Sequence, residues 1–112
     1  MVRKKTQVQK IVKDYVRGFP SGFRIEGVFL FGSYATGKAR EGSDIDLIII
    51  SPDFKKMGFL ERLEFLSILR KKKSSLSNAM DIIGYTPEEF KTIDQESVVM
   101  RRAKKEAVAM RV

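Results

Sequence analysis

The stretch IEGVFLFGSYATGKAREGSDIDLIII, residues 25–50, decides how this chain folds. It holds two apolar runs, 25–31 and 44–50, that are too short for a typical helix and rich in β-branched or aromatic residues. Each run predicts a buried strand, and the second is expected to be the central one. Because the glycine-rich connection between them is short, we expect a mixed sheet and not an all-parallel one.

One helix is predicted before this stretch, over about 6–17. Thr6 and Gln9 have the spacing of a capping box, which would place the start of the helix at Thr6. Glycine and proline residues then interrupt the pattern between 18 and 22. The apolar residues of this helix recur at helical spacing: Val8, Ile11, Val12, Tyr15 and Val16.

After the stretch, the pattern predicts a helix over 59–69, a third strand over 79–85 and two further helices. Thr86 is the expected N-cap of a helix that begins at Pro87, with Glu89 as its capping-box partner. A last helix over about 97–106 would be followed by an edge strand within 108–112. The apolar faces of the 59–69 helix and of the last helix are expected to hold Leu60, Leu63, Leu66 and Leu69, and Val99, Ala103 and Ala107.

Length and composition limit the chemistry. The chain has 112 residues, which we expect to form a single domain, 1–112, of the α/β (α+β) class. It has neither His nor Cys, which excludes imidazole or thiolate zinc sites, Ser-His nucleophile pairs and disulfides. The remaining carboxylates, hydroxyls and backbone amides suit a hard cation and phosphate. No run is long and apolar enough for a membrane span or a secretory signal, so a cytoplasmic protein is expected.

The net charge of +8 is unevenly distributed along the chain. Residues 1–17, 55–73 and 101–112 are basic, whereas the two stretches between them are acidic. Basic segments usually form solvated surfaces, but acidic blocks flanked by basic helices also fit a metal site that receives a polyanionic ligand. Binding to RNA is left open.

Two kinds of phosphate site compete for residues 32–46. Gly32, Gly37 and Lys38 match the glycine and lysine positions of a P-loop. However, Ala39 stands where a P-loop needs Ser or Thr, and a new strand follows where a P-loop needs a long helix. The sequence therefore disfavours the P-loop.

The second kind of site combines a phosphate cradle with carboxylates. Gly32 and Ser33 are expected at the end of a strand, leading into a short turn of helix whose free backbone amides and side-chain hydroxyl can hold phosphate oxygens. Asp44 and Asp46 are two residues apart on a predicted strand, so both carboxylates should project from one face and bind one or two magnesium ions. Asp81, on the third predicted strand, can complete the cluster, in a site suited to phosphoryl transfer. Because its neighbours Met80, Ile82 and Ile83 are apolar, Asp81 is expected at a partly dehydrated position.

Simpler interpretations of the same residues exist. Ser43 and Asp44 could form a turn or a cap, and an isolated Asp-x-Asp pair is common by chance. An EF-hand is excluded because no glycine and glutamate follow at the required positions. The apolar run after Asp46 favours a cation, since two carboxylates beside apolar residues would repel each other and lose hydration.

These residues resemble the signature of the minimal nucleotidyltransferases of the DNA polymerase beta superfamily, of the MntA-like antitoxin type. The similarity covers nearly the whole chain and includes Asp81 and the segment 86–90. The sequence departs from many members at Thr36, where they carry Arg, and at Ala107, where they carry Gly. The residues that carry the resemblance are Gly32-Ser33, Gly37 and Ser43-Asp44-Ile45-Asp46-Leu47.

The resemblance implies a nucleotidyltransferase fold and specific roles for these residues. Gly32, Ser33 and Ser43 would bind a nucleoside triphosphate, with ATP expected. Asp44, Asp46 and Asp81 would be the catalytic residues and would hold two Mg²⁺ ions, Asp81 also helping to deprotonate the acceptor hydroxyl.

The resemblance also implies a biological role. Proteins of this type are antitoxins that work beside a helical HEPN-type ribonuclease and add AMP to one of its tyrosines. The alternative is a catalytically silent module of the same fold that binds nucleotide, RNA or a partner. The sequence leaves open the base, the acceptor and whether the chain forms a homodimer or a heteromer.

Overall fold

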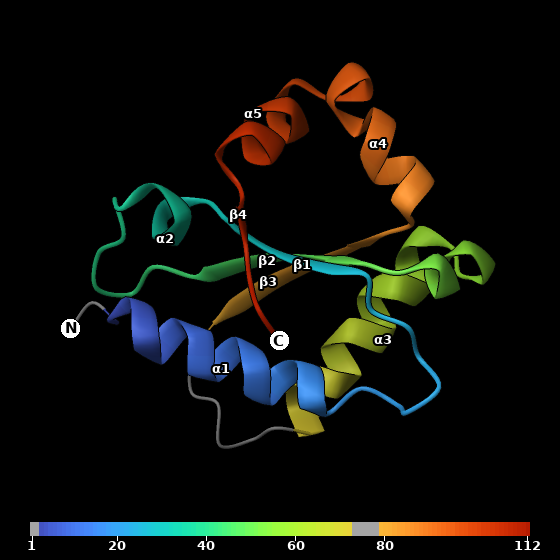
Figure 1. Ribbon diagram of the computed structural model, residues 1–112, viewed down its shortest axis with the longest axis horizontal. Helices are drawn as coiled ribbons and strands as arrows, with labels where there is room; N and C mark the ends of the chain where they lie inside the picture. The colour runs from blue at the N-terminus through green and yellow to red at the C-terminus, as the bar shows by residue number, and fades with distance from the viewer. Residues whose placement is uncertain (1–2, 73–78) are drawn as a thin grey trace.

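A computed structural model describes residues 3–72 and 79–112 as one mixed sheet flanked by helices (Figure 1). The strand order is β3-β2-β1-β4. The elements in chain order are α1 (Lys5–Arg17), β1 (Gly27–Phe31), α2 (Ser33–Thr36), β2 (Ile45–Ile50), the 3-10 helix η1 (Pro52–Lys56), α3 (Phe59–Lys72), β3 (Met80–Tyr85), α4 (Pro87–Glu96), α5 (Val98–Glu106) and β4 (Val108–Ala109).

The sheet combines both strand orientations, as the short connection predicts. β1 pairs antiparallel with β2 and with β4, whereas β3 lies parallel to β2. β2 is therefore an interior strand, and the predicted edge strand at the C-terminal end is present as two residues. The α/β prediction with a mixed sheet is confirmed.

Alternate residues of β2 contribute to two different apolar layers. Ile45, Leu47 and Ile49 belong to the cluster formed with α1 and α3, whereas Ile48 and Ile50 belong to the cluster formed with α4 and α5. This alternation follows from the two-residue period of a strand. Figure 1 shows α1 and α3 on one side of the sheet and α4 and α5 on the other.

One buried cation joins three elements of the fold. The Arg62 guanidinium, on α3, donates to the Gly84 carbonyl on β3 at 3.2 Å and to Glu89 Oε1 on α4 at 2.6 Å. The same carboxylate accepts a hydrogen bond from the Thr86 backbone amide, so the predicted capping box of α4 is confirmed. Both hydrogen bonding to Arg62 and the capping box lower the pKa of Glu89.

Several sequence predictions about where helices begin and which of their residues are buried are wrong. α1 begins at Lys5, one residue before the predicted start, and Gln7, not Gln9, accepts the hydrogen bond from the Lys4 amide. On the last helix Val99 is 76% exposed and Met100 is buried in its place, because the helix packs only at its Met100 and Ala103 side. Leu60 on α3 is likewise 77% exposed.

The short turn of helix expected after Gly32 and Ser33 is present as α2, whereas η1 was not predicted, and β1 begins at Gly27 and not at residue 25. A helix of five residues such as η1 is too short to show a hydrophobic period, so sequence periodicity cannot reveal it. None of the described helices is both long enough and apolar enough to span a bilayer.

Candidate active site

The sharp turn at the end of β1 brings backbone against a carboxylate of β2. Phe31 pairs with Asp46 across β1 and β2, so the next residue, Gly32, lies beside the Asp46 side chain. Gly32 has φ 72° and ψ −152°, a region that side chains rarely tolerate. A Cβ on Gly32 would overlap Asp46 Oδ2 and lie 3.1 Å from Asp46 Cγ. Only glycine therefore allows this close approach.

α2 starts directly after this turn, with Ser33 as its first residue. The amides of Ala35 and Thr36 donate to the Gly32 carbonyl, and Gly37 ends the helix in the left-handed conformation. The first amides and the half-buried Ser33 side chain are thus held at the same end of the sheet as Asp46. The turn and the start of α2 thus have the positions that the sequence predicts, and phosphate binding by them stays a prediction.

The parallel pairing of β2 and β3 brings Asp46 and Asp81 together. The two residues are register partners, so the charge of the Asp81 carboxylate acts on the Asp46 carboxyl group. Burial, as the largest cause, and the negative charges of Asp81 and Asp44 together raise the pKa of Asp46 to about 6. Asp46 thus keeps a proton at pH values where an ordinary aspartate is ionised.

Asp44 lies outside the strand on which the sequence predicts it. It lies one residue before β2, and its side chain is exposed, as is that of Asp81, which was expected to be partly dehydrated. Asp44 is close enough to raise the pKa of Asp46. Within residues 3–72 and 79–112, however, no three acidic side chains converge closely enough to hold a metal ion as they stand.

Ser43 closes the turn that leads into β2. Its Oγ accepts a hydrogen bond from the Arg40 amide at 2.8 Å, and its own amide donates to the Arg40 carbonyl at 2.9 Å. Gly42 completes this turn with φ 84°. The turn role that the sequence left open is therefore present, and nucleotide binding by Ser43 stays a prediction.

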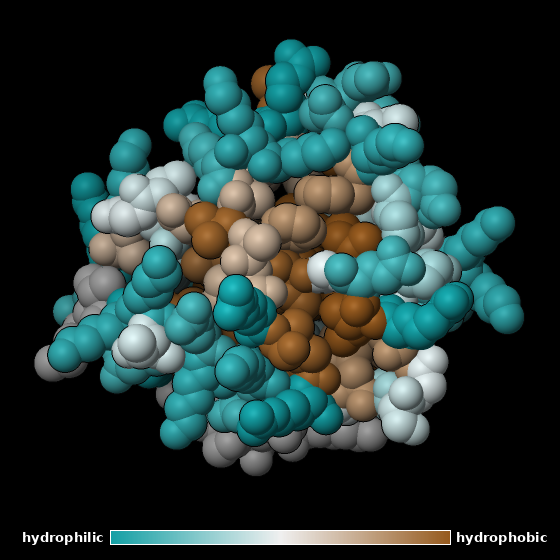
Figure 2. All heavy atoms as spheres, viewed as in Figure 1, coloured by the Kyte–Doolittle hydropathy of each residue, from teal (hydrophilic) through white to brown (hydrophobic). Residues whose placement is uncertain are grey.

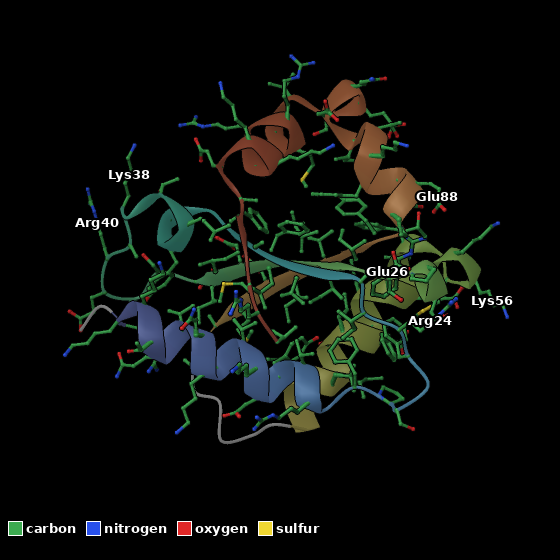
Figure 3. The ribbon with its side chains drawn as sticks, in the orientation of Figure 1. Arg24, Glu26, Lys38, Arg40, Lys56 and Glu88 are labelled. Carbon is green, nitrogen blue, oxygen red and sulfur yellow. The ribbon has the colours of Figure 1, made fainter. Side chains whose placement is uncertain are left out.

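Two cations lie at the same end of the sheet, and neither was assigned to the carboxylate site from the sequence: Lys38 was considered only for the disfavoured P-loop, and Arg40 was not considered. Lys38 and Arg40 are exposed on the loop between α2 and β2, and Figure 3 shows their side chains pointing outward from it. Other labelled residues, such as Lys56, lie at the opposite end of the molecule. The sequence signal of Lys38 and Arg40 is weak, because two basic residues within a stretch of net negative charge do not stand out.

Sequence comparison matches most of the chain to a known family. The model of the nucleotidyltransferase domain matches residues 7–109 of the chain. MntA of Haemophilus influenzae, named as a protein adenylyltransferase, is 33% identical over 110 residues, covering 93% of this chain and 80% of that protein. A Methanocaldococcus jannaschii protein, also named as a protein adenylyltransferase, is 29% identical over 66 residues, or 59% of this chain. The match spans 66% of that relative, just under two thirds of its length.

Solved structures share the fold at lower sequence identity. A structure named as a nucleotidyltransferase of Sulfolobus solfataricus has a TM-score of 0.60 at 24% identity, covering 93% of this chain and 76% of that one. A toxin–antitoxin structure with AMP-PNP has a TM-score of 0.57 at 19% identity, covering 90% of this chain and 70% of that one. These likenesses establish the fold alone.

Proposed function

Because this chain belongs to the nucleotidyltransferase domain family, we propose that it transfers a nucleotidyl group from a nucleoside triphosphate, ATP, to a protein hydroxyl, with pyrophosphate leaving. The observation that carries the proposal is the Asp46–Asp81 pair beside Gly32. A chain that only binds a partner does not need a carboxylate whose ionisation is suppressed by its neighbours, because such clustering destabilises the fold. Sites that transfer phosphoryl groups, in contrast, use clustered carboxylates to hold metal ions.

The triphosphate is assigned to the turn between β1 and α2. Gly32 leaves room for a phosphate oxygen next to the backbone, and the first amides and hydroxyl of α2, from Ser33 onward, supply donors. Ser43 shapes the loop that faces this turn, and we assign it to the nucleotide site as well. Lys38 and Arg40 add positive charge that attracts the polyanion to this end of the sheet.

The donor set fits divalent cations. Carboxylate oxygens are the ligands that Mg²⁺ prefers, and the raised pKa of Asp46 marks a position where added positive charge would be stabilising. Asp44, Asp46 and Asp81 would hold two Mg²⁺ ions. The bound ions would neutralise charge that develops on the phosphate oxygens.

Asp81 is assigned to the acceptor side of the site. Its carboxylate is exposed on β3, an edge strand of the sheet, so an incoming hydroxyl can reach it. Asp46 lies one strand further in, next to Gly32. Asp81 can accept the hydroxyl proton as the oxygen attacks the α-phosphorus and the bond to pyrophosphate breaks.

We assign the acceptor hydroxyl to a tyrosine of a helical HEPN-type partner, which makes this chain the antitoxin of a pair. Support comes from MntA of Haemophilus influenzae and from the toxin–antitoxin structure with AMP-PNP. Asp81 is exposed and lines a hollow of about 410 Å³ between α3 and β3, where a side chain of the acceptor protein can enter. The second candidate is a silent module that binds nucleotide or partner without transfer.

Calorimetry with AMP-PNP tests the nucleotide site directly. We expect saturable binding that requires Mg²⁺ and is lost in Asp44→Asn and Asp46→Asn. Asp14→Asn, on α1 and remote from the site, is the matched control and should bind as the unmodified chain does. Unchanged Mg²⁺-dependent affinity in both site variants would contradict the assignment. Binding without any transfer to a partner would favour the silent module.

A further inference from the structure

Apart from the candidate active site, a hollow lies on the face of the sheet against which α1 packs. It has a volume of about 540 Å³ and opens between the N-terminal part of α1, α2 with the loop after it, and β4. Pockets of roughly 300–1,000 Å³ are of the size that holds small molecules. Its apolar lining includes Val8, Leu30, Tyr34, Val108 and Met110.

This hollow is separate from the carboxylate site. Leu30 belongs to the cluster formed with α1, and strand residues alternate between faces, so Leu30 points away from the side on which its neighbours Phe29 and Phe31 pack. Asp46 has the same parity on β2 as Ile48, which packs toward α4 and α5. The hollow and the carboxylates therefore lie on opposite faces of the sheet.

The rim of the hollow carries one sign of charge. Arg3, Lys5 and Arg111 line it, and none of its described lining residues is acidic. Figure 2 shows apolar residues gathered at the centre of the visible face, where β4 crosses β1 in Figure 1, with hydrophilic residues around them. An apolar interior with a cationic rim is complementary to a ligand that has an apolar body and an anionic end.

We propose that this hollow binds a free anionic amphiphile, a hydrocarbon chain or ring that carries one carboxylate. The apolar body would contact Leu30, Val108 and Met110, and the carboxylate would lie near Lys5 and Arg111. This site goes beyond the proposed transfer reaction. It is also connected to it, because Tyr34 and Ala35 of α2 line the hollow and follow Ser33 directly. The ligand thus stabilises the helix that begins with the triphosphate cradle.

Decanoate is the probe, and its binding to the full chain is measured by backbone NMR and by calorimetry. We expect saturable binding with shifts centred on Leu30, Tyr34 and Val108. Acetate has the charge without the chain, and decyltrimethylammonium has the chain with the opposite charge. Each should bind about tenfold more weakly or worse. Equal binding of the cationic amphiphile, or shifts centred elsewhere, would overturn the proposal.

Reversing the rim charge gives the second arm of the test. Lys5 and Arg111 are exposed, so the double variant Lys5→Glu/Arg111→Glu should fold normally and bind decanoate about tenfold more weakly. Lys10→Glu/Lys13→Glu makes the same charge change on α1 outside the lining and should change affinity less than about twofold. Equal losses in both variants would show non-specific attraction and contradict the proposal. Neither arm depends on nucleotide transfer, so the proposed function can fail while this site stands.

Discussion

Asp46 and Asp81 are register partners across the parallel strands β2 and β3, and the negative charge of Asp81 helps to raise the pKa of Asp46. Asp46 is in addition pressed against the backbone of Gly32 at the end of β1. Three strands thus meet at one carboxylate. Ionisation of Asp46 in this position lowers the stability of the chain, and a cation bound beside it would be favourable.

The first prediction concerns Asp46 and pH in the presence of a chelator. The pKa of Asp46 in the folded chain, about 6, lies above the ordinary value of 3.8, so the folded state holds this proton more tightly than the unfolded state does. Its stabilising effect is complete below about pH 4 and is lost as the pH rises through 6. Asp46→Asn removes this loss and should exceed the unmodified chain in stability by about 1 to 2 kcal/mol at pH 7.5, after allowance for partial exposure.

Urea denaturation from pH 4 to 8 measures this difference. Asp14→Asn, which alters a half-exposed carboxylate on α1 that pairs with Arg17, is the control and should show no gain across the same range. A constant difference between Asp46→Asn and the unmodified chain at every pH would mean that Asp46 does not carry the raised pKa.

The second prediction separates the contact at Gly32 from its backbone conformation. Gly32→Ala meets both a forbidden backbone region and the Asp46 carboxylate, and it should destabilise the chain by about 3 kcal/mol. Gly37→Ala is the control, because Gly37 also has positive φ, 76°, but nothing lies within 4 Å of an added Cβ. Its cost should be about 1 kcal/mol. Equal costs in chemical denaturation would show that Gly32 serves the turn alone.

The third prediction tests Ser33 as a phosphate ligand. Ser33→Ala removes one donor among several backbone amides and should weaken AMP-PNP binding by about tenfold, equivalent to about 1 to 2 kcal/mol. Thr36→Val is the control, since the Thr36 hydroxyl bonds back to the Gly32 and Ser33 carbonyls at 3.3 and 3.4 Å. It should leave AMP-PNP affinity within about twofold. Titration calorimetry showing equal losses would argue that both hydroxyls only stabilise α2.

The fourth prediction addresses Arg62 as the connection between α3, β3 and α4. Arg62→Ala leaves the Gly84 carbonyl and Glu89 without their partner and should cost about 2 to 3 kcal/mol in thermal or urea denaturation. Arg102→Ala removes an exposed pair with Glu106, at 3.1 Å, and should cost less than about 0.5 kcal/mol. A cost below 1 kcal/mol at Arg62 would show that packing alone holds these elements.

The sequence predicted the strands well because their signal is local. The apolar run ending at Ile50 and the two-residue spacing of Asp44 and Asp46 imply a buried strand with acidic residues at its start, and the mixed sheet follows from the short connection. The pairing of Asp46 with Asp81 was also within reach, since both begin neighbouring strands.

Features that depend on tertiary contacts, or on a choice between two local pairings, were not predictable in the same way. Val99 and Leu60 fit an apolar helical period, but the sheet is too small to cover both flanks of each helix, and they remain exposed. The start of α1 depends on Gln7 reaching back to Lys4, which competes with the equally plausible Thr6–Gln9 pair. The close approach of Gly32 to Asp46 requires knowing that β1 and β2 are in register.

The central claim, that these carboxylates catalyse transfer, is tested most directly by Asp81→Asn. The measurement is incorporation of label from ATP carrying it at the α-phosphate into a tyrosine of the HEPN-type partner, at saturating Mg²⁺. Because Ser33, Asp44 and Asp46 remain, Asp81→Asn should keep AMP-PNP affinity within about threefold while losing nearly all label transfer. Transfer at the unmodified rate by Asp81→Asn would contradict the account.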